Sequence, residues 1–177
     1  MQIGALTSWH SVSSGAYHTA AIKTNGTLWA WGGNGYGQLG RNNTASTSSP
    51  VQLGALATWV DCAAGTHHSL AVTADGTLWA WGRNQVGQLG QNDRISRSSP
   101  SAVGASLKWS KVSAGGFHSL AITTSGTLYG WGHNSGEAPG AVGDNTTVHR
   151  SSPTQVGTET KWISVETGVA TSFGIKV

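Results

Sequence analysis

Three histidines stand at equal intervals in this 177-residue chain, at positions 18, 68 and 118. Imidazole binds metal ions and transfers protons near neutral pH, so such a series could supply a metal site if the fold brought the rings together. The next equivalent position in the series is occupied by Thr171, and no acidic residue occurs at any of the four equivalent positions. We therefore expect no metal at His18, His68 and His118, but a structural ring that hydrogen-bonds a turn backbone.

The single cysteine, Cys62, is the strongest candidate nucleophile in the sequence. A catalytic thiol needs a basic, partly open setting and a paired imidazole. Cys62 instead takes the place that Val12, Val112 and Val165 hold in equivalent segments. We expect a small buried side chain there, because free cysteine commonly packs as an apolar residue.

The residue pattern argues against a dinucleotide-binding site and against a glycosidase-type pair of carboxyl groups. Residues 35–40 read Gly-Tyr-Gly-Gln-Leu-Gly, which matches a dinucleotide fingerprint, but no helix pattern follows and the equivalent second stretch has Gln85 in place of the first glycine. The seven acidic residues share no column and form no evident carboxyl pair of the glycosidase type. We therefore predict no catalytic residues, no cofactor and no enzyme activity.

The elements that position these residues follow an internal repeat of about 50 residues. All nine tryptophans fall into three columns of this repeat, which argues for an architectural role. The columns are Trp9, Trp59, Trp109 and Trp162, then Trp29 and Trp79, and finally Trp31, Trp81 and Trp131.

Each repeat unit contains four short extended segments, which in the first unit are residues 9–14, 18–23, 27–31 and, after the proline, 51–53. Asn25-Gly26 separates the second segment from the third, and such a pair accepts the positive φ angles of a two-residue hairpin turn. No segment has the 3.6-residue apolar period of a helix. The pattern predicts an all-β fold built from four-stranded propeller blades.

A family resemblance follows from these motifs. The series Trp-x-x-Val-x-x-Gly-x-x-His, Gly-Thr-Leu-x-x-Trp-Gly-x-Asn, Gly-Gln-Leu-Gly and Ser-Pro resembles the regulator of chromosome condensation repeat. The resemblance implies a β-propeller, commonly of seven blades, and a family in which some members bind chromatin and act as exchange factors for small GTPases. The third unit departs from the pattern, with Gly-Ala-Val-Gly at 140–143 and three extra residues near 135–139.

The phase of the repeat predicts one domain over residues 1–177, with units at about 5–54, 55–104 and 105–157 and a partial unit at 158–177. These amount to about 3.5 units, whereas propellers typically need at least four blades to close. We therefore expect a partial propeller that another chain completes, and not a free monomer. A two-chain ring with two incomplete blades, a distorted seven-position ring and docking onto a different protein all stay open.

Composition limits the partners. Charged residues make up only 10% of the chain and the net charge is +3, which argues against nucleic acid as a partner. No apolar run approaches the roughly 18 residues of a membrane helix, so we expect no membrane partner. The first ten residues lack the pattern of a secretion signal, which favours the cytoplasm or a virion.

The loops after each third segment keep their flanks and vary inside, which is typical of a binding surface. We predict a non-catalytic protein-interaction or structural subunit that binds itself or another protein. The alternative is a virion or surface adhesion module that binds glycans through the same loops. The candidate partner-binding residues are Tyr36, Arg41, Val86, Arg94, Arg97, Glu137, His149 and Arg150.

Overall fold

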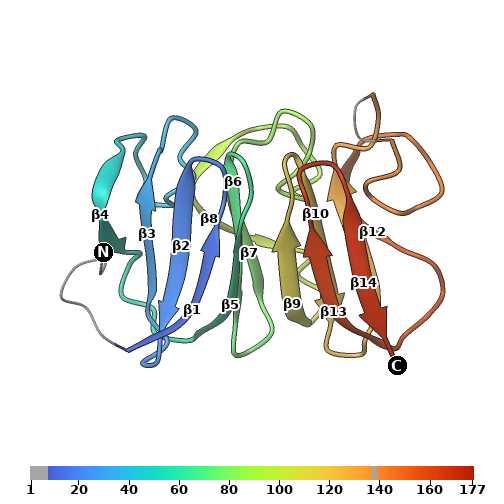
Figure 1. Cartoon of the computed structure of the whole chain (residues 1–177), viewed down its shortest axis with the longest axis horizontal. Coiled ribbons are helices and arrows are strands. Elements are labelled where there is room, and N and C mark those ends of the chain that lie inside the picture. Colours follow the sequence, from blue (N-terminus) through green and yellow to red (C-terminus); the bar gives the residue numbers. More distant parts are fainter. Residues whose placement is uncertain (1–7, 137–138) are drawn as a thin grey trace.

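The computed structural model describes residues 8–136 and 139–177 and is all-β over that part of the chain. Three four-stranded antiparallel sheets, here called blades 1 to 3, stand side by side and are followed by a two-stranded hairpin (Figure 1). Within each blade the strands pair in chain order. The prediction of propeller blades in an unclosed stack is confirmed.

The strand bounds repeat from blade to blade. Blade 1 consists of β1 (Trp9–Ser14), β2 (His18–Lys23), β3 (Leu28–Gly32) and β4 (Thr47–Gln52). Blade 2 consists of β5 (Trp59–Ala64), β6 (His68–Thr73), β7 (Leu78–Gly82) and β8 (Arg97–Val103). Blade 3 consists of β9 (Trp109–Ala114), β10 (His118–Thr123), β11 (Leu128–Gly132) and β12 (Arg150–Gln155), and the hairpin of β13 (Trp162–Thr167) and β14 (Ser172–Lys176).

The turn between the second and third strands forms where the Asn-Gly pair predicts it. Gly26 has a φ of +76°, a conformation that costs glycine little. The Asn25 side-chain oxygen accepts hydrogen bonds from the backbone N–H and the hydroxyl of Thr27, at 3.2 and 2.7 Å. This local bonding fixes the register of β2 against β3.

The fourth strand differs from the prediction, because it begins before the proline rather than after it. β4 starts at Thr47 and contains Pro50. Proline cannot donate a ladder hydrogen bond, but β4 is the outermost strand of its sheet and needs none on its open side. The pairing of β3 with β4 also slips between Ala30 and Gly32, which accommodates the interruption.

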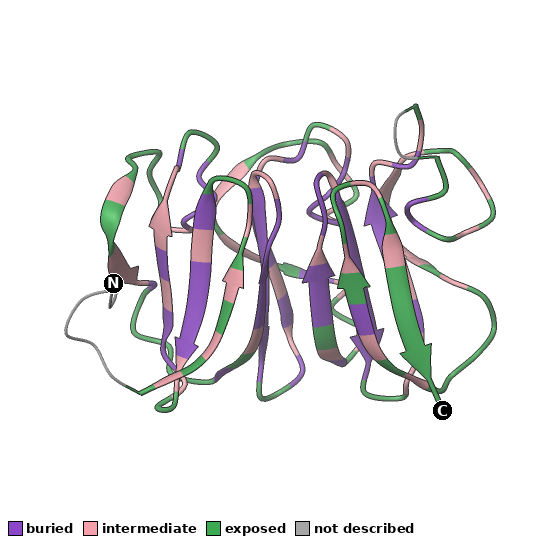
Figure 2. Cartoon of the chain, viewed as in Figure 1, coloured by how far each residue is buried: buried purple, intermediate pink, exposed green. Residues whose placement is uncertain are grey.

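The core lies between blades rather than within one sheet (Figure 2). The first strands β1, β5, β9 and β13 contact one another in series, so they form the inner side of the stack. Hydrogen bonds also cross between these strands, since the Ala64 N–H donates to Ser13 Oγ and the Val112 N–H to Asp61 Oδ2, both at 3.0 Å. No helix able to span a membrane occurs in the described residues.

Candidate interaction surface

One rim of the stack carries the turns between first and second strands together with the long loops between third and fourth strands (top in Figure 1). We call it the upper rim; it comprises residues 15–17, 33–46, 65–67, 83–96, 115–117, 133–136, 139–149 and 168–171. Seven of the eight candidate partner-binding residues come from these loops or from the first residue of the strand that follows them. The upper rim is therefore where the predicted surface can be tested.

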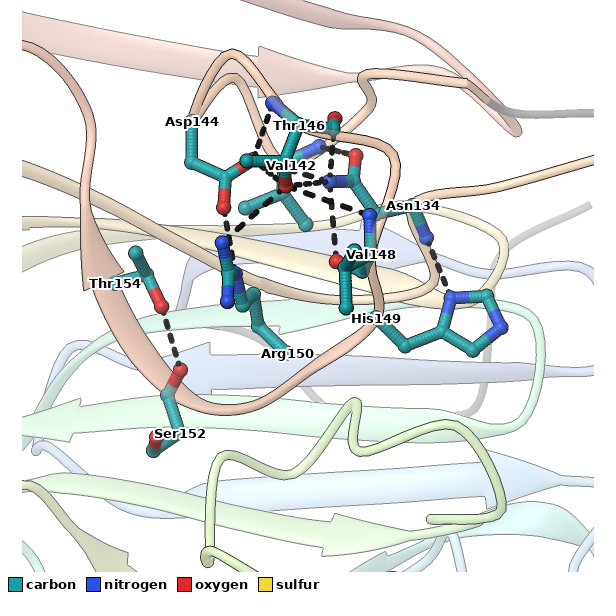
Figure 3. A network of polar contacts seen from close by, with 9 residues as sticks. All are labelled: Asn134, Val142, Asp144, Thr146, Val148, His149, Arg150, Ser152 and Thr154. Atoms are coloured by element: carbon teal, nitrogen blue, oxygen red, sulfur yellow. Dashed lines mark hydrogen bonds and ion pairs between the residues drawn. The ribbon is translucent and has the colours of Figure 1, made fainter.

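A buried asparagine organises each long loop. The Asn34 amide nitrogen donates to the carbonyl oxygens of Asn43 and Ala45, each at 3.0 Å, and its oxygen accepts from the Leu39 N–H at 2.9 Å. Asn84 and Asn134 are also fully buried. In blade 3 the Asn134 side chain bonds Asp144, Thr146 and Val148 in the same manner (Figure 3).

Each long loop also reaches the next blade. The Asn42 N–H donates to the Ser98 carbonyl at 2.8 Å, and the Asn92 N–H to the Ser151 carbonyl at 2.6 Å. The carbonyl of Gln38 accepts from the Trp81 indole N–H at 2.8 Å. These hydrogen bonds to the next blade fix the backbone of the loops. Only the outward-facing side chains are therefore free to vary.

Two of the predicted partner-binding residues, Arg97 and Arg150, form ion pairs with aspartates of their own chain. Arg97 is the first residue of β8 and bonds Asp93 through two nitrogens, at 3.0 and 2.7 Å. Arg150 begins β12, and its Nε lies 2.6 Å from Asp144 Oδ2 (Figure 3). The Arg97 bond lowers the pKa of Asp93 to about 2. We expect these two arginines to brace the loops rather than to contact a partner.

Tyr36 belongs to a row of stacked side chains that crosses from blade 1 to blade 2. Its ring lies 4.9 Å from the ring of His67, and Tyr17 stacks on the same imidazole at 4.7 Å with the planes 6° apart. The Arg83 guanidinium lies over the Tyr36 ring at 5.0 Å. Burial, followed by the charge of Arg83, lowers the pKa of His67.

The row continues into blade 3. Arg83 also lies over the Phe117 ring at 5.2 Å, and Phe117 meets His133 edge-on at 6.4 Å. His133 in turn lies 4.6 Å from His149, which accepts a hydrogen bond from the Asn134 N–H through Nδ1. We name this row, from Tyr17 through His67, Tyr36, Arg83, Phe117 and His133 to His149, the aromatic row.

The remaining candidates are more scattered. Arg94 is exposed and close enough to His149 that its charge contributes, after burial and His133, to a lowered pKa of that ring. Arg41 and Val86 are half-buried, and the Val86 N–H donates to the Gln88 side chain within its own turn. Glu137 lies outside the described residues. The structure thus groups Tyr36 and His149 in one row, and Arg41, Val86 and Arg94 lie outside it.

The histidine column pins successive blades together. His18 Nε2 lies 2.7 Å from the hydroxyl of Ser69, and that hydroxyl donates to the Gln38 carbonyl at 2.8 Å. His68 meets Ser119 at 3.0 Å in the same way. Because the serine proton points to the carbonyl, the imidazole N–H must be the donor to serine. The serine of the next blade is a partner that the sequence analysis did not name, beside the expected backbone bond, which His118 makes to Thr171.

Burial keeps these rings uncharged. It lowers the pKa of His68 to about 3, with smaller contributions from neighbouring histidines. The pKa values of His18 and His118 fall to about 4, again chiefly through burial. Among the described residues, no three histidine, cysteine or acidic side chains come together in a metal-binding arrangement.

Cys62 packs in the core between blades 1 and 2, as its valine column predicts. Burial raises the pKa of its thiol to about 12, with a further contribution from the charge of Asp61. A thiol of this kind is protonated at neutral pH and closed to substrates, so its chemistry is that of a packing residue.

The two ends of the stack expose side chains that the interior covers. Val12 is 66% exposed on blade 1, whereas Cys62, Val112 and Val165 in its column are at most 8% exposed. At the other end Phe173 and Ile175 are 65% and 62% exposed. We call these the leading face (Trp9, Val12, Trp29 and Trp31) and the trailing face (Phe173 and Ile175).

Comparison with known proteins matches these repeats to two models of the regulator of chromosome condensation (RCC1) repeat. One model covers residues 25–72 and 75–122, and the second covers 9–38, 59–88 and 109–136. Together they span more than half of the chain. The chain belongs to the RCC1 repeat family.

Solved structures of RCC1-type propellers share its fold. Prp20p from Saccharomyces cerevisiae, studied for its binding to Gsp1p and histones, superposes with a TM-score of 0.82 at 25% identity over 98% of this chain and 45% of its own. Yeast RCC1 (Prp20) bound to Kap60 gives 0.80 at 26% identity, over 98% and 43% of the respective chains. Human WBSCR16 gives 0.66 at 18% identity, over 95% and 57%.

This RCC1-repeat chain therefore spans less than half the length of the two yeast structures. A search of curated protein sequences found no match. The side chains that sequence reasoning missed on the upper rim are Tyr17, His67, Phe117, Arg83 and His133. They occupy two columns that vary between units just as the long loops do, and that variation was the available signal.

Proposed function

We propose that this chain is a non-catalytic protein-interaction subunit whose open blade faces are covered by a second copy of itself. The observation that supports this most directly is the reversal of burial at the two ends. Ile22, Val72 and Ile122 are at most 1% exposed, while Ile175 in the same column is 62% exposed. Burying one such side chain stabilises an assembly by about 1.5–3 kcal/mol.

A second copy is the occupant that fits the chemistry of the faces. Inside the chain, each interface packs the column of Trp9 and Val12 from one blade against the column of Phe173 and Ile175 from the blade before it. A leading face placed on a trailing face repeats this arrangement. Such a head-to-tail contact either closes into a ring or continues as an open array.

The relatives support a protein-binding role in a general way. Prp20p binds Gsp1p and histones, and yeast RCC1 (Prp20) has been seen bound to Kap60. All are protein partners, and this chain corresponds to under half of either propeller. We extend to this chain the use of the propeller as a protein-binding scaffold, without assigning it any of those partners.

The native mass of the 177-residue chain tests the proposal. Sedimentation velocity at micromolar concentrations should give an assembly larger than the 18.2 kDa chain. Replacing Ile175 with lysine should shift the protein to the monomer, because a charge cannot be buried without a partner. A well-behaved 18.2 kDa species of the unaltered chain contradicts self-assembly.

The matched control is Ile95→Lys. Ile95 is 67% exposed, comparable with Ile175, but it lies in the long loop of blade 2 and on neither open face. Its replacement should leave the mass of the assembly unchanged. If both lysine variants dissociate the protein equally, the association is nonspecific and the trailing face is not its site.

The alternative of a virion or surface adhesion module depends on exposed indole rings that could stack on sugars. All nine tryptophans lie in the described residues, and each is at least half-buried. Their placement favours the scaffold. Tryptophan emission that shifts on addition of members of a glycan panel would support the adhesion module instead.

A further inference from the structure

The five arginines of the chain all lie in the long loops of the upper rim or at the first residue of the strand that follows such a loop, whereas the five lysines lie in neither place. Arg41, Arg83 and Arg94 stand in the long loops, while Arg97 and Arg150 begin the strands that follow them. Arginine differs from lysine in presenting a planar fork of donors that matches carboxylate and in stacking on aromatic rings. The upper rim therefore concentrates the cation that is suited to recognise planar anions.

Only part of this positive charge is neutralised within the described residues. Asp93 pairs with Arg97, and Asp144 pairs with Arg150. No carboxylate of the described chain forms an ion pair with Arg41, Arg83 or Arg94. Over the described residues, the upper rim and the two arginines that follow its loops carry five positive and two negative side chains, a net charge of +3.

Arg83 lies at the centre of the aromatic row, and its neighbours fix the orientation of its guanidinium. Its guanidinium lies over the rings of both Tyr36 and Phe117, at 5.0 and 5.2 Å from their centroids. Its Nε and Nη2 donate to the Gln85 side-chain oxygen. The third nitrogen, Nη1, donates no hydrogen bond to the described part of the chain. A neutral amide and two rings thus orient the cation without cancelling its charge.

We propose that the aromatic row is a docking surface for an acidic peptide segment of a partner protein, with a carboxylate bound to Arg83. The surrounding Tyr17, Tyr36 and Phe117 supply flat, rigid contact area of the kind enriched in protein interfaces. Arg94, exposed in the long loop of blade 2, supplies a second cation on the same rim. This surface is separate from the open blade faces, so the inference goes beyond the proposed self-assembly.

A peptide fits the row better than nucleic acid does. Tyr17 stacks on His67, and the Arg83 guanidinium lies over the Tyr36 and Phe117 rings, so these contacts already cover part of the ring surface on which bases could stack. Three arginines that pair with no carboxylate of the described residues are also few for a chain of phosphates, whose affinity depends on many cations. One or two carboxylates match the charges that the row presents.

Fluorescence anisotropy with a fluorescein-labelled peptide of six Glu-Gly pairs tests the proposal. Binding should be measurable at low salt and should weaken by about tenfold between 50 and 500 mM NaCl, as exposed charge pairs do. Arg83→Gln should weaken it by about fivefold or more, and Tyr36→Ala by about threefold. A Lys-Gly peptide of equal length should not bind.

The control variant is Lys108→Gln, which removes an exposed cation from the opposite rim and should change the affinity by less than about twofold. Each variant's native mass and circular dichroism are measured, so that loss of assembly or folding is distinguished from loss of docking. The proposal fails if the acidic peptide does not bind, if Arg83→Gln binds as well as the parent, or if a twelve-nucleotide oligo-dT binds more tightly than the peptide.

Discussion

Blade 2 and the two ends of the stack carry the same columns of residues in different surroundings. In blade 2 both faces are covered, and Trp81 and Leu70 are completely buried. Blade 1 leaves Trp31 half-buried, and the hairpin exposes Phe173 in the column of Leu70. The apolar character of a face is therefore set by the repeat and not by the presence of a neighbour. An apolar column that is exposed at an open end is therefore a candidate surface for association with another chain.

The interfaces also differ from one another. The histidine pins between blades 1 and 2 and between blades 2 and 3 are buried, whereas His118 meets Ser172 of the hairpin in a part-buried bond of 3.1 Å. The hairpin itself has Thr171 in the histidine column and so offers no such ring to the next position. The pins thus become weaker toward the trailing face.

Lowering the pH should destabilise every interface that contains a histidine–serine hydrogen bond. This is the largest effect on stability that we expect. The free histidine pKa is 6.5, while those of His18 and His118 are about 4 and that of His68 is about 3. Between these values the unfolded chain binds more protons than the folded chain. The contribution of these neutral rings to the free energy of unfolding is therefore fully present above pH 6.5. It falls as the pH decreases, by at most about 4 kcal/mol per pH unit when all three rings contribute.

Urea unfolding between pH 7.5 and 5, followed by far-UV circular dichroism, measures this slope. Replacing His68 with glutamine should lower stability at pH 7.5 but also reduce the slope by about one third, because one of three proton acceptors is lost. Replacing the exposed His10 with glutamine is the control and should leave the slope unchanged. A parent protein equally stable at both pH values contradicts the assignment of buried neutral rings.

Truncating a tryptophan in the interior should cost more than the same truncation at the open end. Trp81→Ala removes a fully buried ring and a hydrogen bond to Gln38, and should destabilise the chain by about 3–5 kcal/mol. Trp31→Ala, on the leading face, should cost about 1–2 kcal/mol. The denaturant midpoints of the two variants make the comparison. Equal losses would mean that the leading face is already covered in solution.

Much of the fold was predictable because the repeat specifies it locally. The bounds of β1 and β2 agree with the predicted segments, since alternating residues and the Asn25-Gly26 turn determine both. The fourth strand begins at Thr47, earlier than the proline pattern predicts. An outer strand tolerates Pro50, and edge position is a property of the assembled sheet rather than of the local sequence.

The candidate surface was predicted less well. Arg97 and Arg150 follow loops whose sequence varies between units, which predicts partner binding, but each is paired with an aspartate of its own loop. The spacing of Asp93 and Arg97 hinted at this pair, whereas Asp144 and Arg150 are brought together by the altered third loop. The aromatic row could not be foreseen, because it joins residues from three blades whose lateral spacing appears only in the structure.

A glycine column gives the most local comparison between interior and end. Gly65 lies where the inner strand of blade 2 turns beside blade 3. A Cβ on Gly65 would stand 2.5 Å from the Gly115 carbonyl oxygen and from the His68 ring, which is too close for either backbone or buried ring to yield easily. On Gly168 of the hairpin the nearest obstacle is the Thr171 hydroxyl at 2.6 Å, the end of a side chain that can rotate away.

We therefore expect Gly65→Ala to destabilise the chain by about 2 kcal/mol and Gly168→Ala by less than about 1 kcal/mol, as measured by thermal or urea unfolding. Gly35→Ala is the control for the alanine itself, because nothing lies within 4 Å of a Cβ at that position. Its stability should change by less than about 0.5 kcal/mol. If Gly168→Ala proves as costly as Gly65→Ala, the hairpin is packed against a further blade in solution, and its trailing face is already engaged.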